Sequence, residues 1–77
     1  MTFSKLPALK AKEVIRAIER AGFVFLRQTG SHAIYVNCLT HSRTVIPIHP
    51  GKTIKMPLLK AIITDCNLTV EQFIEML

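Results

Sequence analysis

The stretch that decides the fold of this chain is Phe23–Cys38, FVFLRQTGSHAIYVNC. Two runs rich in apolar, aromatic and β-branched residues flank the pair Gly30-Ser31, a composition typical of two strands joined by a tight turn. The stretch therefore predicts a β-hairpin whose strands cover Phe23–Thr29 and His32–Cys38.

The second strand of this hairpin has two chemically different faces. Because successive side chains point to opposite faces of a strand, one face carries Ala33, Tyr35 and Asn37. The other face carries His32 together with apolar neighbours, namely Ile34, Val36 and Cys38. An exposed role for His32 conflicts with those neighbours, and the conflict is resolved if strand twist and the turn expose the end of the strand.

A third strand follows at Thr44–Ile48. Pro47 has no N–H to donate to a neighbouring strand, so this strand lies at the edge of the sheet or ends at the proline. The following residues, His49–Lys52, contain proline and glycine and predict a turn. We interpret His49 as a turn residue in preference to a second catalytic group.

A helix is predicted on each side of the strands. Before the hairpin, apolar residues at helical spacing predict a helix over Lys10–Ala21 that Gly22 ends. After the third strand, Pro57 fits the first turn of a helix over Leu58–Asp65, with Asn67 as a left-handed stop.

The chain ends in a short third helix over Val70–Met76. Thr69 and Gln72 have the spacing of a capping box, in which each side chain binds the other residue's backbone N–H. The residues that we expect to face the core from the three helices are Val14, Ile15, Ala17, Ile18, Ala21, Leu58, Leu59, Ile62, Ile63, Phe73, Ile74 and Leu77.

Together these elements predict one domain over residues 1–77 of the α+β class. The order α-β-β-β-α-α gives two layers, in which helices cover one face of a three-stranded antiparallel sheet. No apolar run approaches the ~18 residues that a membrane span needs. Residues Met1–Pro7 do not have the pattern of a signal peptide, so we expect a cytoplasmic protein with no membrane partner.

The chain is strongly basic. Ten Lys and Arg residues outnumber five Asp and Glu residues, which gives a formal net charge of +5. This excess favours a polyanionic partner such as nucleic acid or an acidic protein. Lys12, Arg16 and Arg20 recur along one side of the first helix, either as an ordinary solvated face or as a face toward phosphates.

The cysteines do not indicate a metal site. Cys38 and His41 are spaced like a pair of zinc ligands, but a second such pair is missing from the sequence. We expect no metal and no other cofactor. Cys66 is interpreted as a small buried apolar residue.

Several segments, in order, resemble the HicA family of small bacterial toxins, the ribonuclease partners of HicB antitoxins. They cover about Lys10 to the C-terminus: Glu19–Phe23 (ERAGF), Arg27–His32 (RQTGSH) with Tyr35, Thr44–His49 (TVIPIH) with Lys52, Leu58–Ile63 (LLKAII) and Asn67–Phe73 (NLTVEQF). The resemblance implies a fold like that of a double-stranded-RNA-binding domain and a type II toxin that cleaves mRNA without a metal. It also implies an acidic HicB-like antitoxin as partner, with oligomers formed only through that complex.

The family's catalytic histidine falls on His32. An imidazole titrates near neutral pH and can act as a general acid or base. We expect RNA contacts from the cations Arg27 and Lys52, from the turn, and from Tyr35 by stacking on a base. The turn contributes Gly30 and Ser31.

Each of these residues also has a simpler interpretation. Gly30 and Ser31 are ordinary turn residues, Tyr35 packs well in a core, and Arg27 fits a solvated strand face. Two other functions therefore stay open beside the ribonuclease. The chain is then either a non-catalytic module that binds double-stranded RNA or a module that docks an acidic antitoxin.

Overall fold

The structure is a computed structural model that describes residues 6–77. The prediction about a signal peptide rests mainly on residues 1–5, which lie outside the described residues. No helix within residues 6–77 has both the length and the apolar character that crossing a membrane requires.

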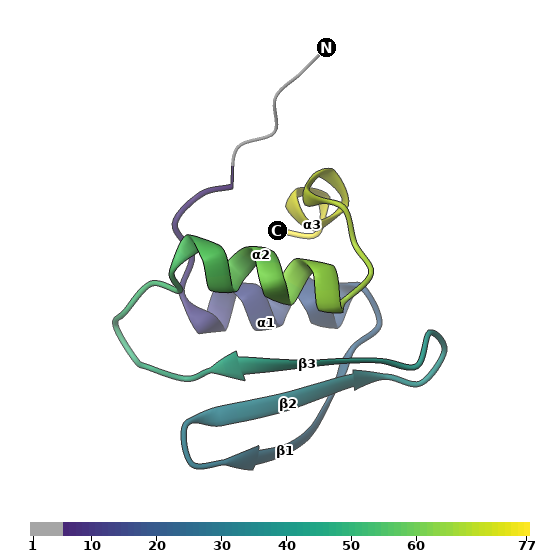
Figure 1. Ribbon diagram of the computed structural model, residues 1–77, viewed down its shortest axis with the longest axis horizontal. Helices are drawn as coiled ribbons and strands as arrows, with labels where there is room; N and C mark the ends of the chain where they lie inside the picture. Colours follow the sequence, from purple (N-terminus) through teal and green to yellow (C-terminus); the bar gives the residue numbers. More distant parts are fainter. Residues whose placement is uncertain (1–5) are drawn as a thin grey trace.

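The six predicted elements are present in the predicted order (Figure 1). They are α1 (Ala11–Arg20), β1 (Val24–Thr29), β2 (His32–Asn37), β3 (Ser42–Pro47), α2 (Met56–Asp65) and α3 (Val70–Glu75). The α+β class is confirmed, and each element lies within two residues of its predicted bounds.

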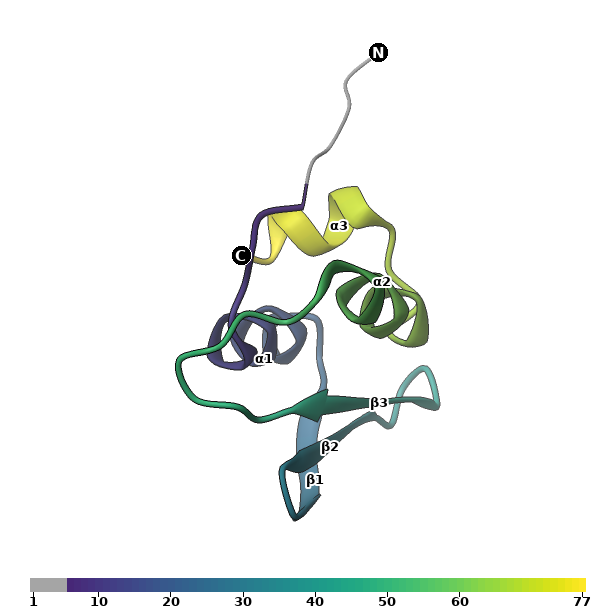
Figure 2. The same ribbon diagram turned by 60° about the vertical axis from the view of Figure 1, so that its left-hand side comes forward.

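The strands form one antiparallel sheet in the order β1-β2-β3. Helices α1 and α2 lie on one face of this sheet, closest to β3, and α3 lies beyond them on the side away from the sheet (Figures 1 and 2). Pro47 is the last residue of the edge strand β3, a place where its missing N–H costs no sheet hydrogen bond. Strand β1 forms the other edge, farthest from the helices (Figure 2).

The core fills the space between the helices and the sheet. Its largest fully buried apolar side chains are Val14, Ile18, Ile46, Leu59, Ile62 and Phe73. Two residues that we predicted to face inward are exposed, Leu58 by 41 % and Leu77 by 42 %. Leu77 follows the last residue of α3, where no further helical turn holds it against the core. On α2, Leu59 and the residues three, four and seven positions later already fill the buried stripe, and Leu58 lies at its edge.

Helix ends are stabilised as the sequence predicts, with one addition. The N–H of Gln72 donates to Thr69 Oγ1 at 3.1 Å, and the N–H of Thr69 donates to Gln72 Oε1 at 2.9 Å. At the start of α1, where no Ser, Thr, Asp or Asn stands, Glu13 accepts from the backbone N–H of Lys10 at 3.0 Å. Asn67 has the left-handed φ of 59° predicted for a helix stop.

Asn37 ties the sheet to the end of α1. Its side chain is buried, its Nδ2 donates to the carbonyl oxygen of Ala21 at 3.3 Å, and its Oδ1 accepts from the N–H of Leu39 at 3.0 Å. The face of β2 that carries Asn37 is therefore the face that the helices cover. His32 lies on the opposite face of β2, which the helices do not cover.

Candidate active site

The β1–β2 hairpin closes through the two-residue turn Gly30-Ser31. Gly30 has φ of 58°, in the left-handed region that favours glycine. A Cβ atom built on Gly30 would meet no atom within 4 Å, so the turn needs glycine for its backbone conformation and leaves open space beside it. Gln28 Nε2 donates to the carbonyl oxygen of Gly30 at 2.9 Å and holds the turn from β1.

This turn places His32 at the first position of β2, between Thr29 of β1 and Pro47 of β3. The His32 side chain is exposed, as the argument from the strand end predicts. It lies on the face opposite that of Asn37, whose side chain meets the end of α1, and its neighbour on this face, Ile34, is itself only 6 % exposed. A rigid strand thus carries an imidazole that solvent and a large ligand can reach.

The loop between β3 and α2 is fixed beside this turn. The N–H of Ile48 donates to the carbonyl oxygen of Ser31 at 2.6 Å, and the N–H of Lys52 donates to the carbonyl oxygen of His49 at 3.1 Å. The second bond confirms His49 as a turn residue. Farther along the loop, the N–H of Ile54 donates to the carbonyl oxygen of Leu9 at 2.7 Å. These bonds hold the loop that carries Lys52 beside the β1–β2 turn, and Figure 1 shows the loop and the turn at the same end of the sheet.

Cations surround this end of the sheet. Arg27 lies opposite Ile34, so it shares the open face with His32. Lys52, Lys55 and His49 line a groove of about 350 Å³ at the start of α2, and Pro47, the partner of His32 in the sheet, lines it too. Lys55 was missed in the analysis of the sequence, because it belongs to no motif.

The distribution of charge explains why this end is basic. No Asp or Glu occurs within residues 20–64, which comprise the whole sheet, the loop after β3 and most of α2. Six Lys and Arg residues lie in the same segment. The sheet and the loop after β3 therefore contribute cations and no carboxylates of their own, and the resulting positive potential attracts an anionic ligand. The sequence already contains this information, because its few acidic residues all lie outside residues 20–64.

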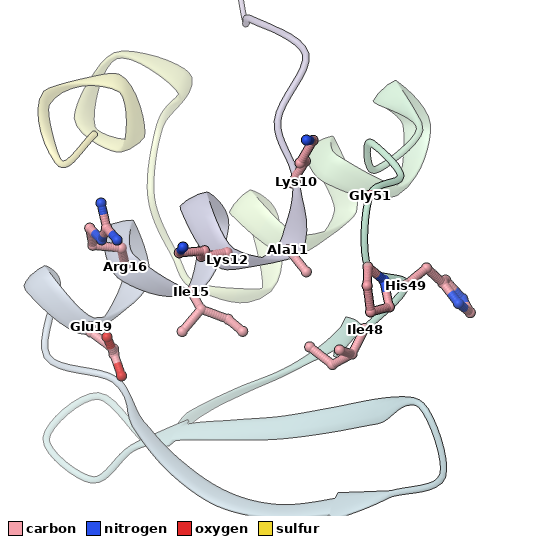
Figure 3. Close-up of a pocket in the computed structure, with 10 residues that line it drawn as sticks. Lys10, Ala11, Lys12, Ile15, Arg16, Glu19, Ile48, His49 and Gly51 are labelled. Carbon is pink, nitrogen blue, oxygen red and sulfur yellow. The ribbon is translucent and has the colours of Figure 1, made fainter.

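The basic side of α1 divides into two parts. Lys12 and Arg16, with Glu19, line a second groove, of about 530 Å³, between α1 and the loop after β3. In Figure 3 the side chains of Ile15 and Ile48 lie between the helix and the sheet, whereas the ring of His49 points away from them. Arg20 instead donates to the carbonyl oxygen of Met76 at 2.7 Å, which gives it a structural role at the end of α3.

Tyr35 lies on the opposite face of β2 from His32. Its ring is 94 % buried, being 6 % exposed, and meets the ring of Phe25 edge to face at a centroid distance of 5.6 Å. Burial, and secondarily the charge of Glu19, raise the pKa of its hydroxyl. This environment fits a packing role, and base stacking by Tyr35 stays a prediction.

The possible metal ligands do not gather. Cys38 and His41 are exposed in the turn between β2 and β3, which follows the opposite end of β2 from His32. Figure 1 shows this turn at the other end of the sheet from the β1–β2 turn. Across residues 6–77 no group of three or more His, Cys, Asp or Glu residues is placed to hold a metal ion.

Comparison with protein-family models gives a match. A family model described as "HicA toxin of bacterial toxin-antitoxin" matches residues 11–68, which run from α1 through α2 and include the hairpin, β3 and the loop that carries Lys52. A search of curated proteins finds no match.

Proposed function

The chain belongs to the HicA family of bacterial toxins, and on this premise we propose that it is a metal-independent endoribonuclease that cleaves mRNA. Membership implies that the chain is the toxin of a toxin–antitoxin pair and has a cognate antitoxin. The observation that carries the ribonuclease proposal is the exposed imidazole of His32 on a rigid strand, at the basic end of the sheet.

RNA supplies its own nucleophile for this reaction. The 2′-oxygen attacks the neighbouring phosphorus, the bond from phosphorus to the 5′-oxygen breaks, and that oxygen leaves with a proton. His32 takes the proton of the 2′-hydroxyl or delivers a proton to the leaving oxygen. General acid–base catalysis of this kind raises the cleavage rate by ~10²–10⁴-fold. Water makes the other of the two proton transfers, so the protein needs to hold the strand, move one proton through His32 and stabilise the added negative charge.

The remaining site residues hold the strand in this proposal. Arg27, on the same open face as His32, and Lys52, on the adjacent loop, bind phosphate oxygens. The free space beside Gly30 admits the RNA backbone to the turn, and Ser31 fixes the turn through its bond from Ile48. Tyr35 is 6 % exposed, and a base can stack only on the part of its ring that solvent reaches.

We propose an acidic HicB-like protein as the antitoxin. Residues 20–64 contribute six cations and no carboxylates, which favours an acidic partner, and such charge complementarity speeds association. Covering this surface keeps RNA away from His32. Residues 1–77 form one domain that acts on mRNA in the cytoplasm. This domain forms oligomers only through the antitoxin complex.

The test compares His32→Asn with His41→Asn. An amide cannot exchange protons at neutral pH, and asparagine tolerates the left-handed φ of 57° at His41. Both histidines are exposed, so neither substitution disturbs the core. We expect His32→Asn to slow cleavage of a defined mRNA by ~10²–10⁴-fold with RNA affinity nearly unchanged, and His41→Asn to cleave at the rate of the unmodified chain.

The same assay with EDTA tests metal independence, since we expect the cleavage rate to stay constant. If the purified chain binds RNA without shortening it, the chain is a non-catalytic RNA-binding module and the ribonuclease proposal is wrong. Equal activity of the two variants would remove His32 from the mechanism.

A further inference from the structure

Strand β1 is an unprotected edge of the sheet. It pairs with β2 on one side, and no strand within residues 6–77 pairs with its other side. All six of its residues are exposed, whereas four of six residues are buried in β2 and three of six in β3. The N–H and C=O groups of alternate β1 residues therefore point outward without a strand partner.

The exposed side chains of β1 are unusually apolar for a free edge. Val24, Phe25 and Leu26 are consecutive and exposed by 55 %, 53 % and 53 %. Val24 lies opposite Val36 on the open face, while Phe25 lies opposite Tyr35 on the helix-covered face. A strand added to this edge would bury apolar surface on both faces of the sheet, and each buried apolar Å² stabilises the complex.

We propose that an extended, mainly apolar segment of the cognate antitoxin, with an acidic side chain opposite Arg27, docks along β1 as an additional strand of the sheet. This inference deepens the proposed function, because it locates the antitoxin's contact. It rests on membership of a toxin–antitoxin family and does not depend on cleavage of RNA.

Charge decides the chemistry of the occupant. Arg27 lies on β1 beside the apolar residues, and neither β1 nor the strands next to it contain a carboxylate. An acidic segment gives Arg27 an opposite charge across the new strand pair. A second copy of this chain would instead bring another strand without carboxylates from a molecule of net charge +5.

The shape of β1 also disfavours self-association. The register shifts between Phe25 and Arg27, so Leu26 lies in a β-bulge. A bulge increases local twist and blunts the flat edge-to-edge stacking of like strands. RNA is a poor occupant as well, because three successive apolar side chains give phosphates no partner.

The first test compares Leu26→Glu with Leu39→Glu. Both are exposed leucines, by 53 % and 92 %, and Leu39 lies in the turn between β2 and β3. We expect Leu26→Glu to raise the Kd for the purified cognate antitoxin by on the order of tenfold or more. The matched Leu39→Glu should change it by less than about twofold. Equal affinities for the two variants would overturn the proposal.

The second test needs no variant and decides the matter if Leu26→Glu fails to fold. Hydrogen exchange of the unmodified chain is measured alone and in the antitoxin complex. We expect the outward N–H groups of β1 to exchange at least roughly tenfold more slowly in the complex. Unchanged exchange along β1 would overturn strand addition.

Two controls separate the alternatives. Sedimentation of the free chain tests self-association, and a dimer that Leu26→Glu abolishes would assign β1 to a second copy and overturn the proposal. Cleavage of RNA by Leu26→Glu should equal that of the unmodified chain but resist inhibition by the antitoxin. A chain that proves inactive on RNA still tests docking, because affinity and exchange are measured without a reaction.

Discussion

The two cysteines of this chain occupy opposite environments. Cys38 is exposed in the turn after β2, whereas Cys66 is buried at the end of α2. Burial, with a smaller effect from the charge of Asp65, raises the pKa of the Cys66 thiol to about 12. The interpretation of Cys66 as a small buried residue is confirmed by its 4 % exposure.

We expect one cysteine to react with a maleimide at pH 8. The thiolate is the reactive form of cysteine, and a pKa of about 12 keeps the Cys66 thiol protonated at pH 8. Burial also keeps the reagent away from it. Mass spectrometry of the native chain should show a single adduct on Cys38, and denaturation should add the second. Rapid labelling of Cys66 in the folded chain would show that α2 opens readily.

The raised pKa of Cys66 also makes the free energy of unfolding depend on pH. An unfolded thiol with the ordinary value of 9.0 loses its proton before the folded thiol does. The unfolded state then binds fewer protons, so the free energy of unfolding falls as pH rises from about 9 toward about 12.

At the scale of elements, local chemistry sets where each helix begins and ends. Thr69 and Gln72 bind each other's backbone N–H groups, and Asn67 takes the left-handed conformation between α2 and α3. These contacts join residues close in sequence, which is why the sequence predicted them. The short helix α3 depends on its cap, because isolated helices of this length are unstable in water.

We expect Thr69→Ala to lower the free energy of unfolding by about 1 kcal/mol, because it removes the acceptor for the Gln72 N–H. The matched variant is Thr64→Ala. Thr64 is an exposed residue of α2 whose hydroxyl donates to the carbonyl oxygen of Lys60 within the same helix. Its loss should change stability by less than about 0.5 kcal/mol in urea unfolding. Equal effects would show that the α3 cap does not hold the folded state.

At the scale of the whole molecule, acidic residues are confined to the two outer segments of the chain. The positive surface of the sheet and the loop after β3 is the result. Binding of RNA by such a surface releases counterions, so affinity falls as salt rises. The proposed phosphate contact of Lys52 should be visible in this dependence.

We expect Lys52→Gln to reduce the slope of log K against log salt for single-stranded RNA by roughly 0.7, the value of one lost phosphate contact. Lys60→Gln is the matched control, since Lys60 is exposed farther along α2 and lines neither groove near His32. Its slope should equal that of the unmodified chain. The same slope for all three proteins would remove Lys52 from the RNA contact.

The sequence by itself determined the six elements, the tight turn before His32 and the helix caps, because these follow from residue spacing and contacts between near neighbours. Side-chain alternation also predicted which residues of β2 share a face. It did not say which face the helices cover, since Ile34 and Val36 are as apolar as Ala33 and Tyr35.

Only the tertiary structure decided that question, and with it the exposure of His32. Asn37 joins the end of α1 to one face of β2, so the other face stays open. The register of β2 against β3 then sets His32 beside Pro47, and the bond from Ile48 to Ser31 brings the loop of Lys52 alongside. These contacts link residues that are distant in the chain, and their free energy depends on packing the whole core at once.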